Sequence, residues 1–374
     1  KDWEKENDCK VNLTVIPWDK YEETYTTALN SGEGPDVGYM YNEMFPTYID
    51  AGAVEDMSSY VTDEDKKEYK YLSNGNMMDG QYGWPLVTGV PFVLYYNEDI
   101  LNALGEKAPE TWDDFARICQ EATKDTDGDG KVDQYGFACG MNTSDIGAMQ
   151  ILNAYYYSAL WQNGGQVYND DLKSVSFADE AGKEAVTWLK GLTSYMNEDF
   201  MSLSWSDAFS NVFGAGKAAF GITRSSQTDG TTFAETYPDL NWNFVTSLKN
   251  KDFGTFGATD CLTLMSACED KDLAMDFIKY VTGSEFMTAY HAKCPGAALT
   301  ESEPYVGDEK MEKIYTEDKD KWHGIQAGPC GTQILNQLAA DFQGIMSGET
   351  SVDEGLKEAE DYANGLLDEY WANK

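Results

Sequence analysis

The chain has 374 residues and a formal net charge of −38 at pH 7, from 27 basic and 65 acidic side chains. Such a charge repels nucleic acid phosphates and anionic lipid head groups, so nucleic-acid-binding proteins are excluded from the expected classes. The length is large for one hydrophobic core and predicts two lobes. No apolar run approaches the roughly 20 residues that are needed to cross a bilayer.

The first part of the chain alternates predicted strands and helices. Alternating apolar residues predict a strand over 11–16, and apolar residues at helical spacing predict a helix over 19–29. A turn containing glycine and proline at 32–35 leads into a strand over 36–41, and a helix follows around 45–51. This alternation favours parallel pairing in an α/β sheet.

The segment 87–115 is predicted to cross from one lobe to the other. A buried strand over 90–96 is followed by a short helical turn over 97–103, and Pro109 then interrupts the helical pattern. A new helix begins at Thr111, whose hydroxyl can accept from the amide of Asp114 while the Asp114 carboxylate reaches back, in a capping box.

Three crossings are expected, so each lobe should be discontinuous in sequence. The predicted crossings are 97–109, 253–259 and 294–299, which gives an N-terminal lobe of 1–103 with 253–297 and a C-terminal lobe of 104–252 with 298–374. Further helices are predicted over 149–161, 180–192, 270–281, 334–346 and 351–370, and a further strand over 218–223.

Ligands of open α/β sheets bind beyond the carboxyl ends of the strands. This rule selects Trp18 after the first predicted strand, and Tyr41, Asn42 and Glu43 at the end of the next one. Sites for polar ligands can stack aromatic rings on apolar ligand faces and surround ligand hydroxyls with polar side chains. The 10 tryptophans and 24 tyrosines are sufficient for such a site.

Two more tryptophans are candidates for a ligand site. Trp205 and Trp322 lie at loop or element ends, where packing in the core and stacking on a ligand are both open. Catalysis is not expected, because His291 and His323 are the only histidines and neither has a metal-ligand spacing. Seven scattered cysteines give no metal or redox motif, and a disulfide between Cys294 and Cys330 stays an open alternative.

An acidic segment at 125–133 predicts a structural Ca²⁺ site. It places oxygen ligands at the first, third, fifth, seventh and ninth loop positions, as calcium loops do, through Asp125, Asp127, Asp129, the peptide oxygen of Lys131, and Asp133. The twelfth position is Gly136, where such loops carry a bidentate Glu, so water or a remote carboxylate must complete the shell. The alternative is an acidic Asp–Gly turn without a metal.

Several segments carry a family resemblance. Tyr-Tyr-Asn-Glu-Asp at 95–99 and Pro-Glu-Thr-Trp-Asp-Asp-Phe at 109–115 resemble the "YYNKDLF…PPKTWDEF" segment of sugar-binding proteins of ABC transporters, the maltose-binding type. Further segments agree in order along the chain, at 34–37, 164–165, 213–219 and 348–356. Together they cover nearly the whole chain.

The resemblance implies a fold and a role. The fold would be the type II periplasmic-binding-protein fold, in which each α/β lobe is a sheet flanked by helices and a ligand cleft lies between the lobes. The role would be capture of a carbohydrate outside the bacterial cell, by closure of the lobes, for a membrane permease. A monomer is expected, either periplasmic or lipid-anchored at the cell surface. Residues 1–6 read as the end of a helix, so the family's first strand is expected to precede them.

The resemblance also selects site residues. Glu43 matches an acid that binds sugar hydroxyls, and Thr88 and Gly89 lie where relatives have the cleft. Asp260 lies where, in relatives, the second crossover between the lobes faces the ligand. Arg224 follows a strand at a point where many relatives have a stacking Trp. The identity of the sugar therefore cannot be carried over from maltose-binding relatives. The alternatives are a binder of a polyol or glycerol phosphate, and a glycan-processing enzyme. The sugar, its linkage and its length are left open.

Overall fold

The computed structural model describes residues 2–17, 20–32, 34–78, 80–88, 90–143, 149–228 and 231–374. The chain forms two compact units, and both are discontinuous in sequence. Unit 1 contains 1–88 and 259–306, and unit 2 contains 89–258 and 307–374. The chain therefore passes between the units three times, as the sequence predicted. The second passage, between Ala258 and Thr259, lies within the predicted crossing 253–259, whereas the first and the last lie at other residues.

The predicted boundaries differ from those of the structure. The predicted N-terminal lobe extended to residue 103, whereas unit 1 ends its first segment at Thr88. The reason is strand β5 (Phe92–Asn97), which the prediction gave to the N-terminal lobe. This strand forms ladders with two other strands of unit 2, so its hydrogen bonds and buried side chains belong there. The last crossing follows Val306 and not residue 297.

The sheet of unit 1 is antiparallel, in the strand order β1-β9-β4. Strand β1 (Val37–Tyr41) and strand β4 (Trp84–Thr88) both pair with β9 (Thr259–Leu264), which lies between them. The prediction of parallel pairing was wrong for this sheet. Strand β9 returns from far along the chain and runs against both neighbours, a partner that local strand–helix alternation does not reveal.

The predicted strand over 11–16 is also wrong. Residues 11–17 form neither helix nor strand, and the side chains of Leu13 and Val15 are 84% and 81% exposed. Alternating apolar residues are compatible with a strand, but a strand forms only where a neighbour takes up its backbone hydrogen bonds.

Helices pack on this sheet to form the core of unit 1. The longer ones are α2 (Tyr21–Ser31), α3 (Phe45–Asp50), α12 (Lys271–Thr282) and α13 (Ser284–His291). Shorter elements are α1 (Asp2–Glu6), η2 (Asn42–Met44), η3 (Ser58–Tyr60), α4 (Asp65–Glu68), η4 (Leu72–Gly75) and the β2–β3 hairpin (Asn76–Met77, Gly80–Gln81). One core cluster joins Trp84 of β4 and Leu264 of β9 to Met275 and Ile278 of α12.

The sheet of unit 2 has four strands in the order β6-β7-β5-β8. Strand β6 (Tyr135–Ala138) is parallel to β7 (Ala218–Arg224), whereas β5 runs antiparallel to both β7 and β8 (Trp242–Val245). Helix α6 (Trp112–Ala122) covers it and begins at the predicted capping box, which is confirmed. The Thr111 hydroxyl accepts from the amide of Asp114, and the Asp114 carboxylate accepts from the amide of Thr111.

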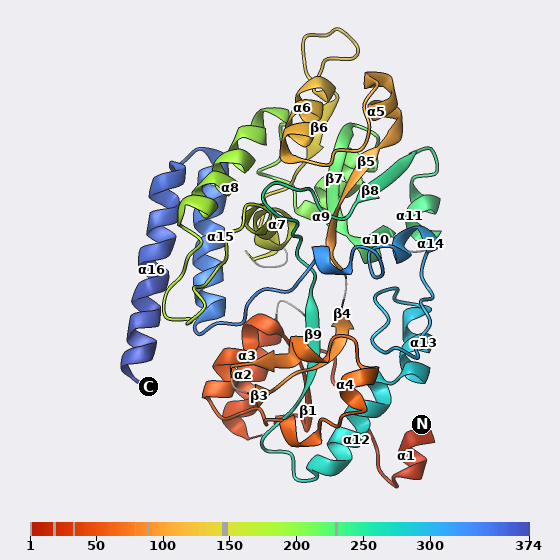
Figure 1. The fold of residues 1–374 in the computed structure, drawn as a ribbon, viewed down its shortest axis with the longest axis vertical. Coiled ribbons are helices and arrows are strands. Elements are labelled where there is room, and N and C mark those ends of the chain that lie inside the picture. Colours follow the sequence, from red (N-terminus) through yellow and green to blue (C-terminus); the bar gives the residue numbers. More distant parts are fainter. Residues whose placement is uncertain are drawn as a thin grey trace. The chain divides into compact units, whose positions relative to one another are not determined.

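The remaining helices of unit 2 surround this sheet. They are α5 (Glu98–Leu104), η5 (Leu152–Tyr156), α7 (Tyr157–Gln162), α8 (Glu180–Gly191), η6 (Leu192–Tyr195), α9 (Trp205–Ala208), η7 (Phe209–Phe213), α10 (Ser225–Thr228), α11 (Thr231–Thr236), α14 (Glu309–Glu312), η8 (Lys319–Lys321), α15 (Gly331–Ser347) and α16 (Val352–Ala372). The last two lie side by side (Figure 1). The predicted cap of α16 is confirmed, since the Ser351 side chain accepts from the Glu354 amide.

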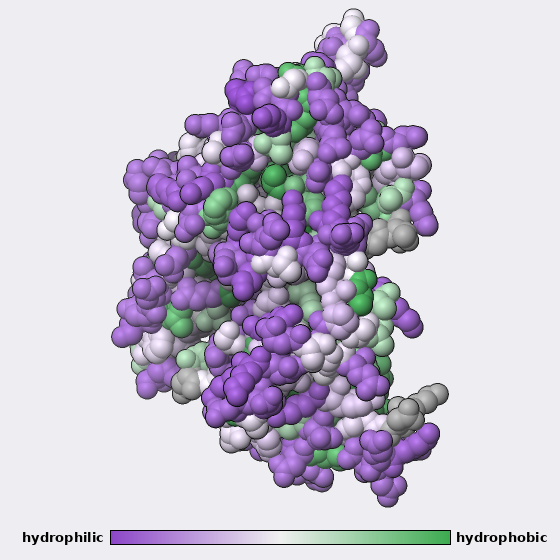
Figure 2. Space-filling model, turned by 45° about the vertical axis from the view of Figure 1, so that its right-hand side comes forward, coloured by the Kyte–Doolittle hydropathy of each residue, from purple (hydrophilic) through white to green (hydrophobic). Residues whose placement is uncertain are grey.

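The hydrophilic surface of the protein agrees with its high content of charged residues. Hydrophilic residues cover most of the face drawn in Figure 2. Among the described residues, no helix combines the length and apolarity that a membrane span requires. The disulfide between Cys294 of unit 1 and Cys330 of unit 2 stays an open alternative.

Replacing Thr111 by Ala should remove the N-cap acceptor of α6 and destabilise unit 2 by about 1 kcal/mol. Urea denaturation followed by tryptophan fluorescence measures the change. Thr47→Ala, at an exposed position of α3, is the matched control and should unfold at the wild-type midpoint. Equal midpoints for Thr111→Ala and the wild type would contradict the role assigned to the cap.

Candidate functional site

The register of β1 and β9 brings predicted site residues of unit 1 together. Tyr41, the last residue of β1, pairs with Asp260 of β9. The short η2 turn follows at once and carries Asn42 and Glu43. Tyr41 and Asp260, far apart in sequence, therefore meet at the carboxyl end of β1, directly before Asn42 and Glu43.

Tyrosines surround Asp260 in unit 1, and sequence reasoning missed two of them, Tyr21 and Tyr39. The Tyr39 hydroxyl donates to the Asp260 carboxylate, and the Tyr41 hydroxyl donates to Glu22 of α2. The ring of Tyr21 lies 6.4 Å from that of Tyr39 and 6.1 Å from that of Tyr41. A sequence signal for Tyr39 existed, because residues two apart in a strand point to the same face.

The electrostatics of this group are unusual for a surface carboxylate. Partial burial, reinforced by the charge of Asp260, raises the pKa of Glu43 to about 7. Burial and the adjacent Asp260 carboxylate likewise raise the pKa of Tyr39 well above its ordinary value. The group thus presents carboxyl and hydroxyl oxygens in a partly desolvated setting, where hydrogen bonds are stronger than in water.

Thr88 lies at the carboxyl end of β4 and pairs with Thr259, next to Asp260. Its side chain is 1% exposed, and within the described part of the chain its hydroxyl oxygen has no hydrogen-bond partner. A buried hydroxyl without a partner costs free energy, so this oxygen is a candidate for a bond to a ligand or water. The predicted site residues Trp18 and Gly89 lie outside the described residues.

Arg224 and Trp205 meet in unit 2. Arg224 ends β7, and its guanidinium carbon lies 5.2 Å from the centre of the Trp205 ring and 5.6 Å from that of Phe92. An arginine Nη2 donates to the Gln150 side-chain oxygen at 3.0 Å. These contacts fix the direction of the guanidinium, and the two flanking rings stabilise its charge. Trp205 is 5% exposed, so its ring is largely a packing surface.

Trp322 does not offer a ligand a free ring face. Its side chain is 5% exposed, and its ring N–H donates to the peptide oxygen of Ile314 at 3.0 Å. A Cβ at Gly257 would lie 2.5 Å from its ring, so backbone packs directly against the indole. For Trp322 the structure favours the packing alternative that the sequence left open.

Sequence reasoning missed a polar position near Arg224. The helix after Gln150 contains a π-helical turn, Leu152–Tyr156, and such turns are frequent at functional sites. Asn153 lies within it, three residues after Gln150, and is 8% exposed. Its side-chain oxygen has no hydrogen-bond partner among the described residues. No sequence pattern distinguishes a π-turn from an α-helix, so this position had no usable signal.

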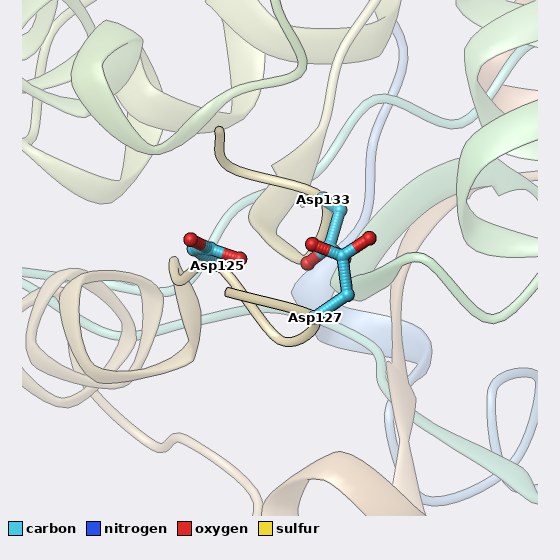
Figure 3. Close-up of side chains that lie close together, drawn as sticks. All are labelled: Asp125, Asp127 and Asp133. Atoms are coloured by element: carbon cyan, nitrogen blue, oxygen red, sulfur yellow. The ribbon is translucent and has the colours of Figure 1, made fainter. Parts of the chain in front are cut away.

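The predicted calcium loop joins α6 to β6. Carboxylate oxygens of Asp125, Asp127 and Asp133 lie within 4.8 Å of one another (Figure 3). Asp125 accepts from the amides of Gly128 and Gly130 at 2.6 and 2.7 Å, and these bonds lower its pKa. The two glycines have positive φ angles of 79° and 90°, which allow the tight turn.

The loop fits a cation in part. Asp129 is outside the group of converging carboxylates and accepts from the Lys131 amide at 2.8 Å. Gly136 cannot supply the carboxylate of the twelfth position, since a Cβ there would lie 2.4 Å from the peptide oxygen of Cys119. Three carboxylates within reach of one point are the hard oxygen donors that Ca²⁺ binds.

A family model described as "Bacterial extracellular solute-binding protein" matches residues 1–304. The chain belongs to this family. Among curated proteins, it is 25% identical over 328 residues to a putative binding protein of Brucella abortus (strain 2308), covering 83% of this chain and 72% of the relative. It is also 32% identical over 131 residues to the Multiple sugar-binding protein of Streptococcus mutans serotype c, covering 34% of this chain and 30% of that protein.

Solved structures share the fold of this solute-binding protein. An ABC substrate-binding protein of Listeria monocytogenes, solved with cycloalternan, has a TM-score of 0.76 at 18% identity and covers 98% of this chain and 94% of its own. The sugar-binding protein MalE of Xanthomonas citri has a TM-score of 0.78 at 18% identity, covering 99% and 93%. The predicted fold class, a two-lobe α/β periplasmic-binding-protein fold, is confirmed.

Proposed function

We propose that this solute-binding protein binds a carbohydrate, most suitably an oligosaccharide, outside the cell membrane and delivers it to the permease of an ABC importer. The observation that carries the proposal is that each unit has a polar group suited to sugar hydroxyls. Unit 1 presents acceptor oxygens at Glu43 and Asp260, and unit 2 presents a fixed guanidinium donor at Arg224. A sugar hydroxyl both donates and accepts, so both groups suit a ligand with many hydroxyls.

Relatives support the carbohydrate class. The Listeria monocytogenes protein was solved with cycloalternan, and a maltodextrin-binding protein of Bdellovibrio bacteriovorus was solved with maltotriose. A Streptomyces coelicolor relative that matches 34% of this chain is described as a diacetylchitobiose binding protein. The acidic group of unit 1 disfavours glycerol phosphate, because a phosphate near Glu43 and Asp260 would be repelled.

Binding, without any bond made or broken, is sufficient for this role. A ligand shifts the chain toward the conformation that it binds best, by as much as its affinity differs between conformations. The permease would then recognise the ligand-bound arrangement. The proposed location is periplasmic or lipid-anchored at the cell surface, in keeping with an extracellular solute-binding family.

Removing either polar group should weaken binding of the same sugar. Glu43→Ala removes an acceptor and Arg224→Ala removes a charged donor, and each should cost roughly tenfold or more in affinity. Isothermal titration calorimetry against maltotetraose, cycloalternan and diacetylchitobiose measures the loss. The matched controls are Glu64→Ala in unit 1 and Lys107→Ala in unit 2, both at exposed positions.

Thermal unfolding of each variant separates loss of binding from loss of fold. Glu43 is half-buried at a strand end and belongs to no hydrophobic cluster, so Glu43→Ala should melt near the wild type. Unchanged affinity in both Glu43→Ala and Arg224→Ala would place the site elsewhere. Absence of binding by the wild type to every sugar tested would refute the carbohydrate class.

We further propose that the loop at 125–133 binds one structural Ca²⁺. Asp125, Asp127 and Asp133 would hold the ion. Asp129 and the peptide oxygen of Lys131, which the sequence also predicts as ligands, would complete its coordination. The convergence of three carboxylates supports this site. The ion would neutralise their mutual repulsion and fix the connection between α6 and β6, without contact to the sugar.

Calcium should therefore stabilise unit 2. At a free concentration one hundred times the dissociation constant, one site adds about 2.7 kcal/mol of stability, which raises the melting temperature. Asp125→Asn should abolish this increase, while Asp170→Asn, an exposed acid of the same unit, should retain it. Differential scanning calorimetry in millimolar CaCl₂ and in EGTA measures both. Identical melting of the wild type in the two buffers would refute the site.

A further inference from the structure

Tyr39 and Asp260 lie on the same face of the sheet in unit 1. The register of β1 and β9 pairs Tyr39 with Leu262 and Tyr41 with Asp260, so Asp260 is the diagonal neighbour of Tyr39 across the two strands. Paired residues share a face and successive residues alternate, which places all four side chains on that face. A tyrosine is long enough to reach a diagonal neighbour, and the Tyr39 hydroxyl donates to Oδ2 of Asp260.

The ring of Tyr39 is itself held in place by helix α2. The backbone amide of Tyr39 donates to the Tyr25 hydroxyl at 2.8 Å, which ties β1 to the helix at this residue. The Tyr21 ring meets the Tyr39 ring edge to face, with centroids 6.4 Å apart. The hydroxyl therefore reaches Asp260 from a ring whose direction is set by a backbone bond and by packing.

A hydrogen bond from Tyr39 restricts how the Asp260 carboxylate can turn. The terminal torsion of an aspartate is broad, so an unrestrained carboxylate samples many directions. An O–H bond to a carboxylate is charge-assisted and about twice as strong as a bond between neutral groups. An acceptor that is oriented before the ligand arrives loses less conformational freedom when the ligand binds.

We propose that Tyr39 is a positioning residue of the carbohydrate site, whose hydroxyl holds the Asp260 carboxylate in the orientation that accepts from sugar hydroxyls. This inference rests on the proposed carbohydrate-binding function. Tyr39 acts through Asp260. Because the phenol gives its one proton to Asp260, the pair offers a ligand acceptor oxygens, and it therefore favours ligand groups that donate, as neutral sugar hydroxyls do.

Unit 1 contains a second tyrosine–aspartate pair that serves as a matched control. The Tyr60 hydroxyl of η3 donates to Oδ1 of Asp272 in α12 at 3.0 Å. The pair has the same chemistry as Tyr39 and Asp260, but Asp272 is exposed and neither residue belongs to the proposed site. Tyr60→Phe thus removes the same O–H group from the same unit without a change at Asp260.

The first test is calorimetric titration with the sugar that binds best among maltotetraose, cycloalternan and diacetylchitobiose. Tyr39→Phe removes one hydroxyl and keeps the ring, so the packing against Tyr21 should stay. Its affinity should fall roughly three- to tenfold, because Asp260 loses one charge-assisted bond. Tyr60→Phe should bind with wild-type affinity. Thermal unfolding of each variant confirms that the chain is folded.

A double-mutant cycle separates positioning of Asp260 from a general structural effect. Asp260→Ala should weaken binding, and Tyr39→Phe should cause no further loss in the Asp260→Ala background, since the carboxylate that it positions is gone. A structural role of Tyr39 would weaken binding equally in both backgrounds. If Asp260→Ala does not fold, Asp260→Asn replaces it. Tyr39→Phe should then cost less than in the wild type, because the bond is to a neutral acceptor.

The outcomes distinguish this inference from the function on which it rests. Wild-type affinity in Tyr39→Phe would overturn the inference and leave the function standing. An equal loss from Tyr39→Phe in both backgrounds would do the same, and so would wild-type affinity in Asp260→Ala. Failure of the wild type to bind any of the three sugars would overturn the function, and the inference with it.

Discussion

The pairing of β1 with β9 is the constraint on which the site of unit 1 depends. Its register sets Tyr41 opposite Asp260, and the η2 turn that carries Glu43 follows Tyr41 directly. The same pairing completes the sheet, since β9 is the strand to which both β1 and β4 bond. A slip of one residue would turn Asp260 to the other face, because side chains alternate along a strand. Fold and electrostatics of unit 1 are thus set together.

In unit 2, strand register also positions a charged group, and this group is positive. Strand β7 ends at Arg224, and the β5–β7 register pairs this residue with Phe92, at the start of β5. Phe92 and Trp205 then flank the guanidinium, while Gln150 fixes its direction. The arginine is one of only two in the sequence. In a chain of net charge −38, a guanidinium held between two aromatic rings is a specific donor and not part of a general basic surface.

Local patterns in the sequence were sufficient for the helices and for part of the site. The capping boxes at Thr111 and Ser351 depend on side chains three residues apart, which any sequence displays directly. The acidic loop at 125–133 was visible for the same reason. The family resemblance supplied the two-lobe fold and pointed to Glu43, Asp260 and Arg224 at once.

Long-range pairing accounts for what sequence reasoning missed. The antiparallel position of β9 and the placement of β5 in unit 2 depend on hydrogen bonds between distant segments, which no local period encodes. The segment 11–16 has a strand pattern but forms no ladder in the described residues. Tryptophans at element ends were ambiguous for a related reason: burial of Trp322 is decided by Gly257, far away in sequence.

The central claim is that Glu43 of unit 1 and Arg224 of unit 2 are carbohydrate-binding side chains. A crystal structure of the complex with the tightest-binding sugar of the panel tests this most directly. The account predicts sugar hydroxyls within about 2.5–3.2 Å of the Glu43 carboxylate and of the Arg224 guanidinium. A sugar bound elsewhere, with both side chains contacting only water, would contradict it.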